Sequence, residues 1–303
     1  MSDVLGRKVS RREFLSFGLA VAGGVITLKP RRTKGAESEG PVPGNRKKAA
    51  RWAFLSDIHI AASPNNHFNG HYPHRNLRRA LEQITGDMPD GMVITGDLAR
   101  WQGNTKDYEN VRAMLAPVAA QRTIHLALGN HDHRARFLNA FGAGGDHEEA
   151  VPNKYVVTGS AGPVRLIMLD SLLCTNMFGG MIGKPQRIWL DTYLRACDDT
   201  PTILCLHHDL RFDLLDAGRL LDIAAPVKKV KAIVYGHSHK YEFLQYAGMH
   251  LVNVPATGYN FTNAQPVGWV EARLTDEGGE FTLHAVGGSR KRDGQPVSLA
   301  WRA

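Results

Sequence analysis

The chain has 303 residues and is 43% hydrophobic, which is enough for one large folded domain with a sizeable core. Its formal net charge of +8 lies mostly in residues 1–36, which hold eight basic and two acidic residues, so the other 267 residues carry 29 basic and 27 acidic side chains. The nearly neutral remainder argues against a nucleic-acid partner, and the longest apolar run, residues 17–28, is too short for a transmembrane helix of roughly 20 residues.

The first 36 residues are predicted to be an export signal. Adjacent Arg11 and Arg12 precede a Phe-Leu pair and a short apolar stretch that contains glycines, which is typical of a twin-arginine leader. The alternative is a basic amphipathic helix, which the glycines disfavour. Residues 37–50 are rich in Gly, Pro and Lys and predict a linker to a folded domain at 51–303. We expect a protein exported to the periplasm or extracellular space, with the twin-arginine translocation machinery as a partner.

From residue 51 onward, strand-length apolar runs alternate with helical patterns. The helical patterns, with apolar residues three and four positions apart, are 76–84, 105–115 and 186–197. The apolar runs that stop at a polar residue are 52–56, 91–95, 124–128, 202–206 and 232–235. Strand-helix-strand units of about 30 residues place the carboxyl ends of their strands at one edge of a sheet, where ligands bind. The sequence therefore predicts an α/β fold in which the five polar ends meet.

The polar residues at these ends are of the kinds that bind metal ions. Asp57 and His59 are two positions apart, as are His237 and His239, so each pair can project to one side of an extended segment. A glycine precedes Asp97 and permits a tight turn there. Oxygen and imidazole donors without a thiolate suit divalent ions such as Mn, Fe or Zn.

In their order along the chain, the five ends resemble the five motifs of the calcineurin-like metallophosphoesterases. The motifs are Asp57-Ile58-His59, Gly96-Asp97, Gly129-Asn130-His131-Asp132, His207 and Gly236-His237-Ser238-His239. Each motif alone is common, but all five in this order at strand ends are specific. The resemblance covers residues 51–260 and implies two packed mixed β-sheets flanked by helices, with a binuclear metal site at the carboxyl ends of the strands.

The resemblance also implies a role for each residue of the motifs. The implied metal ligands are Asp57, His59, Asp97 and His239 for one divalent ion, and Asp97, Asn130, His207 and His237 for the other. His131 would be the catalytic partner of the substrate, and Asp132 would orient it. The implied reaction is hydrolysis of a phosphodiester or a phosphomonoester by a metal-bridging hydroxide. One departure from the family is Asp209-Leu210 after the histidine pair, where many relatives have two prolines.

Other polar residues are further candidates for the site. Asp170 ends an apolar run and is expected to cap or anchor a loop. His67, His71 and His74 follow the first motif in a loop long enough to be a lid, so substrate contact and plain surface are both open. His125 lies within a strand pattern and is expected in the core.

The leading function is that of an enzyme, a binuclear metallophosphoesterase with a small phosphoester substrate. Length and motif order are similar to those of bacterial cyclic-nucleotide phosphodiesterases, while other nucleotides, phospholipid head groups and sugar phosphates are alternatives for an exported enzyme. A nuclease is disfavoured by the nearly neutral charge. The rival from another class is a non-catalytic binding or scaffold protein on the same fold. Such proteins usually lack ligands or the catalytic histidine, and here every position is filled. The sequence leaves the oligomeric state open.

Overall fold

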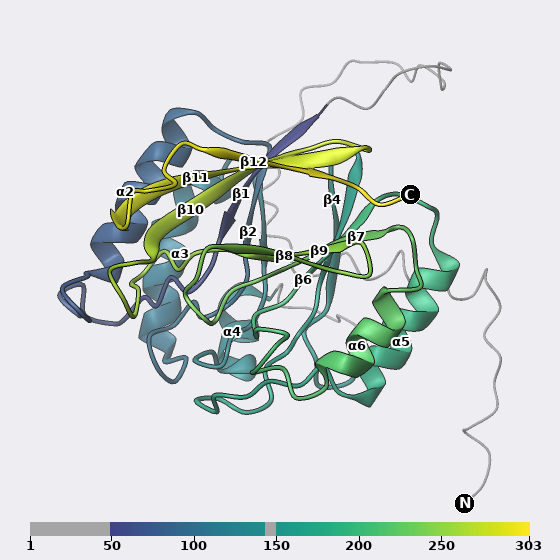
Figure 1. The fold of residues 1–303 in the computed structure, drawn as a ribbon. Helices are drawn as coiled ribbons and strands as arrows, with labels where there is room; N and C mark the ends of the chain where they lie inside the picture. Colours follow the sequence, from purple (N-terminus) through teal and green to yellow (C-terminus); the bar gives the residue numbers. More distant parts are fainter. Residues whose placement is uncertain (1–48, 143–149) are drawn as a thin grey trace, which may run out of the picture.

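The computed structural model describes residues 49–142 and 150–303, so the predicted leader and nearly all of the predicted linker lie outside the described residues. The described part of the chain forms two six-stranded β-sheets with helices on either side of them (Figure 1). Within this part, none of the helices combines the length and the apolar character needed to span a bilayer.

The first sheet has a parallel half and an antiparallel half. Its parallel strands are β1 (Ala50–Leu55), β2 (Gly91–Ile94) and β3 (Thr123–Leu126). Its antiparallel strands are β10 (Pro266–Leu274), β11 (Gly278–Gly288) and β12 (Pro296–Ala300). The order across the sheet is β12-β11-β10-β1-β2-β3, so the last strands of the chain pair with its first strand.

The second sheet has four parallel strands in its centre and an antiparallel strand at each edge. The parallel strands are β5 (Val164–Met168), β6 (Thr202–Cys205), β7 (Val230–Tyr235) and β9 (Met249–Asn253). The edge strands are β4 (Val157–Ala161) and β8 (Glu242–Tyr246). The order is β4-β5-β6-β7-β9-β8.

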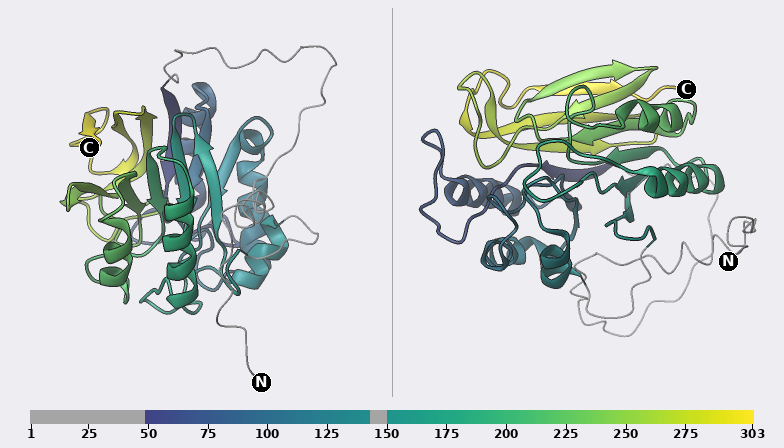
Figure 2. Two further views of the ribbon diagram at one scale, coloured as in Figure 1. Left: turned by 90° about the vertical axis from the view of Figure 1, so that its right-hand side faces the viewer. Right: turned by 90° about the horizontal axis from the view of Figure 1, so that it is seen from below.

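Helices cover the outer face of each sheet. The helices on the side of the first sheet are α2 (Pro73–Gly86), α3 (Thr105–Ala119) and α4 (Arg134–Phe141). Those on the side of the second sheet are α5 (Lys184–Ala196) and α6 (Ala217–Ala224). Figures 1 and 2 show the strands between these two groups of helices. The three predicted helices are α2, α3 and α5, while the eight-residue α4 and α6 were not predicted.

The two faces of the second sheet are buried in different cores. Along β5, Leu166 and Met168 belong to the core between the sheets, while Ile167 belongs to the core under α5 and α6. Alternate strand residues point to opposite faces, so a strand that is buried on both faces reads as an unbroken apolar run. This arrangement confirms the predicted fold of two packed mixed sheets flanked by helices.

Candidate metal centre

The polar residues that follow five parallel strands converge at one edge of the paired sheets. Strands β1, β2 and β3 of the first sheet and β6 and β7 of the second end there. The two sheets are joined at this edge by backbone contacts, such as the bridge between Ser56 and Ala256. The structure brings all seven predicted ligands together, and these are Asp57, His59, Asp97, Asn130, His207, His237 and His239.

The backbone turns sharply at the strand ends. Five of the nine non-glycine residues with positive φ in the described part are predicted ligands, with φ between 48° and 66°: Asp57, His59, Asp97, His237 and His239. Asp and His are among the side chains that tolerate this left-handed region best, but it still carries strain of the kind that gathers at functional sites. At Gly236, a Cβ atom would collide with the side chains of Ser56 and Asp57, so only glycine allows this turn to approach the first strand end.

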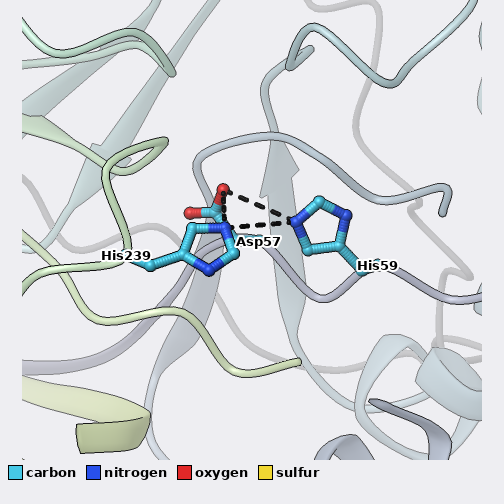
Figure 3. A group of neighbouring side chains, drawn as sticks. All are labelled: Asp57, His59 and His239. Atoms are coloured by element: carbon cyan, nitrogen blue, oxygen red, sulfur yellow. Dashed lines mark hydrogen bonds and ion pairs between the residues drawn. The ribbon is translucent and has the colours of Figure 1, made fainter. Parts of the chain in front are cut away.

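The first group of ligands is drawn in Figure 3. The Nε2 atom of His239 lies 3.2 Å from Asp57 Oδ1 and 3.3 Å from His59 Nε2. The other carboxylate oxygen of Asp57 accepts a hydrogen bond from the His237 backbone N–H at 3.1 Å. The carboxylate is thus anchored on one side, while Oδ1 is buried without a hydrogen-bond donor.

The second group of ligands surrounds His207. Its Nε2 atom lies 3.2 Å from Asn130 Oδ1 and 3.1 Å from His237 Nδ1. Asp97 lies between the two groups, because its Oδ2 atom is 3.5 Å from His207 Nε2 and 3.6 Å from His59 Nε2. The Oδ1 atom of Asp97 is anchored by the His131 backbone N–H at 2.8 Å. A carboxylate oxygen placed between both groups is suited to bridge two ions.

Backbone carbonyls set the orientation of the imidazoles. The Nδ1 atom of His207 is 3.1 Å from the Thr95 carbonyl, and that of His239 is 2.7 Å from the Tyr259 carbonyl. A carbonyl only accepts, so each Nδ1 carries a proton, and each ring in its neutral form presents a bare Nε2 to the cluster. Imidazole, carboxylate and amide lone pairs face one another in the cluster at 3.1 to 3.6 Å. Such buried lone pairs repel one another, and cations between them would remove the repulsion. The donor set therefore fits two divalent ions.

Electrostatics of the metal-free cluster depend on the balance between burial and charge. Burial lowers the pKa of His59 to about 3 and that of His237 to about 4. Burial also lowers the pKa of His207, but the carboxylates of Asp97 and Asp57 outweigh it and raise this pKa to about 9. Burial raises the pKa of Asp97, yet the neighbouring His207 imidazolium holds it well below its ordinary value. One proton on His207 thus partly neutralises the two carboxylates until a cation replaces it.

His131 lies at the rim of the cluster. Its Nδ1 atom is 3.0 Å from the carbonyl oxygen of Trp101, and its Nε2 atom is 4.0 Å from Asp97 Oδ2. Its side chain is 17% exposed, whereas the seven predicted ligands are buried. The ring is therefore held by the backbone and accessible to a substrate.

Asp132 does not orient His131 as predicted. It is fully buried, and its carboxylate accepts hydrogen bonds from the backbone N–H groups of Leu98, Ala99 and Gly129 at 2.9 to 3.2 Å. The Tyr108 hydroxyl donates to the same carboxylate at 3.1 Å. Asp132 therefore ties the loop after β2 to the loop after β3, and the carbonyl of Trp101 holds the His131 ring instead.

The other polar residues lie outside the cluster. Asp170 accepts hydrogen bonds from Arg134 and from the backbone of its own loop, which confirms its role as a loop anchor. His125 is 2% exposed and stacks on Trp52, so its place in the core is also confirmed. The three histidines of the long loop share no single role: His67 is exposed, His71 is half-buried, and His74 is buried with its Nε2 atom 2.8 Å from the Ala61 carbonyl.

Three supporting residues were not singled out in the sequence. Asp213 Oδ2 lies 3.6 Å from His237 Nε2, and Asp213 follows the Asp209-Leu210 pair by three residues. Arg100 is buried at 3% exposure and donates a hydrogen bond to the Tyr259 hydroxyl at 3.2 Å. All three residues stand in loops without a local sequence pattern that would have indicated them.

A two-sheet α/β fold with carboxylates, an amide and imidazoles gathered at the strand ends defines a binuclear metallophosphoesterase, an enzyme of metal-dependent phosphoester hydrolysis. The model of the calcineurin-like phosphoesterase family matches residues 50–241, and the chain belongs to that family.

Relatives and solved structures agree with this assignment. A probable cyclic nucleotide phosphodiesterase of Synechococcus sp. (strain WH7803) is 28% identical over 231 residues, which cover 70% of this chain and 84% of that protein. The 3',5'-cyclic adenosine monophosphate phosphodiesterase of Pseudomonas aeruginosa is 26% identical over 221 residues, which cover 68% and 76%. A dimetal phosphatase from Danio rerio shares the fold, with a TM-score of 0.65 at 14% identity over 85% of this chain and 100% of that one.

Proposed function

We propose that this enzyme hydrolyses a phosphodiester, and that its substrate is a small cyclic nucleotide. The observation that carries the proposal is the convergence of every predicted ligand, with His131 at the rim, in a chain with two relatives named for cyclic nucleotides. Imidazole and carboxylate donors suit Mn, Fe or Zn as the two ions. Such ions would polarise the phosphoryl group and lower the pKa of water.

A metal-loaded centre would favour an anionic substrate. Asp57 and Asp97 are the carboxylates among the predicted ligands, and the other ligands are neutral when they bind metal. Two divalent ions therefore leave a surplus of two positive charges in a buried site, where a phosphate is attracted strongly.

His131 is proposed to serve the leaving group. In the hydrolysis, water loses a proton as its oxygen bonds to phosphorus, and the bond from phosphorus to the leaving oxygen breaks. His131 donates a proton to the leaving oxygen, and the proton lost by water restores the protonated His131. The hydrogen bond to the Trp101 carbonyl fixes Nδ1, so Nε2 is the atom that carries the transferred proton.

We also propose that the enzyme works outside the cytoplasm. The support is the order of Arg11, Arg12 and the following Phe-Leu pair in a leader with weak hydrophobicity. Export of a folded chain would allow the metal centre to be assembled before transit.

The proposal is tested with a substrate panel. Protein reconstituted with Mn, Fe or Zn is assayed on a 3',5'-cyclic nucleotide, a linear diester and a monoester, with Asp97→Ala as the metal-site control. We expect the highest kcat/KM for the cyclic nucleotide with the wild type and background rates with the variant. A monoester turned over at least as efficiently as both diesters would overturn the assignment.

A further inference from the structure

Three exposed aromatic rings stand around the metal centre. In the described part of the chain, the rings of Trp101, Phe178 and Phe261 remain 49%, 68% and 55% exposed. Each of them contacts one histidine of the site, with ring centroids 5.4, 4.7 and 4.3 Å apart, respectively. Large apolar side chains that are exposed together at the mouth of a polar site mark a binding surface.

Among the three rings, Trp101 has a rigid support. The guanidinium carbon of Arg100 lies 3.9 Å from the centroid of the Trp101 ring, and Arg100 is buried. The guanidinium is itself fixed by Asn66 Oδ1 at 3.0 Å and by the Tyr259 hydroxyl at 3.2 Å. One face of the indole thus rests on an immobile cation, and its exposed surface is left for a ligand.

Trp101 lies next to His131, the residue that is proposed to protonate the leaving oxygen. Its ring meets the ring of His131 edge to face, at an interplanar angle of 87°. If His131 protonates the leaving oxygen, the group bonded to that oxygen must extend from the metal centre past His131. The indole of Trp101, in edge-to-face contact with His131, then offers a flat apolar surface to this group.

We propose that Trp101 is a stacking platform for a flat ring in the leaving group, namely the base of a cyclic nucleotide. This inference rests on the proposed function and adds to it the residue that selects the nucleoside part. Stacking tolerates any base, because every base has a π face. Trp101 therefore favours nucleotides over sugar phosphates and phospholipid head groups, without selecting adenine over guanine.

The test compares two diesters that differ only in the base: 3',5'-cyclic AMP and ribose 3',5'-cyclic phosphate without a base. For Trp101→Leu we expect kcat/KM to fall about 10- to 100-fold on the first diester and less than about threefold on the second. Trp101→Phe keeps a ring and should stay within about fivefold of the wild type on both. The matched control is Phe212→Leu, because Phe212 is 75% exposed and has the guanidinium of Arg211 5.3 Å from its ring; it should change neither rate.

A binding measurement separates the platform from catalysis. Adenosine 5'-monophosphate titrated into the metal-loaded protein should quench tryptophan fluorescence in the wild type, and Trp101→Phe should remove most of that quenching. Melting temperatures of the variants establish that they are folded.

Several results would contradict the proposed stacking role of Trp101. A loss on both diesters with Trp101→Leu would mean that the residue acts by holding His131, and an unchanged ratio of the two rates would mean that it does not contact the base. A base-specific loss in Phe178→Leu or Phe261→Leu, with Trp101→Leu unaffected, would place the base on another ring. If the wild type cleaves neither diester, the proposed function fails, while the fluorescence titration still decides whether Trp101 stacks on a base.

Discussion

Replacement of Asp132 is expected to lower the free energy of unfolding more than it lowers the turnover of folded, metal-loaded protein. In Asp132→Ala, four buried donors lose their acceptor, namely three backbone N–H groups and the Tyr108 hydroxyl. Each buried donor without a partner costs about 1–3 kcal/mol, but the losses are not additive because the loops relax, so we expect a total of about 3–5 kcal/mol. Asp132→Asn keeps one acceptor oxygen and turns an amino group toward the remaining donors, so we expect about 2–3 kcal/mol.

Urea unfolding of the metal-free variants gives these values from the midpoint and slope. Turnover is then compared at a temperature where all proteins are folded and carry equal metal. Tyr108→Phe is the comparison variant: it removes one donor to Asp132 and the acceptor of the His133 backbone N–H, so it should cost about 1–3 kcal/mol. A hundredfold loss of turnover in Asp132→Ala at unchanged stability would refute this reasoning and would restore a direct role of Asp132 on His131.

Four further predictions concern the metal centre and export. Asp97→Ala should lose metal as well as rate, because one change removes a ligand from both ions; two retained ions in elemental analysis would contradict this. His131→Ala should keep both ions and lose on the order of 10²- to 10⁴-fold in turnover on an alkyl ester, with a smaller loss on a p-nitrophenyl ester that needs little protonation. Near-wild-type turnover on the alkyl ester would count against it. His207 must lose a proton to bind metal, and its pKa of about 9 means that metal affinity rises about tenfold per pH unit from pH 7 to 9 and then levels off. Chelator competition at several pH values measures this slope, and a flat profile would exclude it. Changing Arg11 and Arg12 to Lys should leave the folded protein in the cytoplasm, as cell fractionation would show, and unchanged export would disprove the leader.

The five strands that precede the predicted ligands were predictable, because each is a local apolar run that ends at a polar residue. A run such as 91–95 is apolar throughout because its strand is buried on both faces, and it stops at Gly96-Asp97 because the chain must turn there. The antiparallel strands β10 to β12 and the short helices α4 and α6 were not predicted, since their patterns are weaker and their pairing depends on distant partners.

The sequence by itself determined which polar residues would converge, because each predicted ligand follows a buried strand and parallel strands deliver their carboxyl ends to one edge. Only the tertiary structure decided how the surrounding loops use their polar groups. The family resemblance implied that Asp132 orients His131, but its carboxylate instead faces backbone N–H groups from the loop after β2. The support of Trp101 by Arg100, and of Arg100 by Tyr259, joins loops that lie about 160 residues apart in the chain. No periodicity encodes such contacts, since they arise when two sheets pack and bring the ends of their strands together.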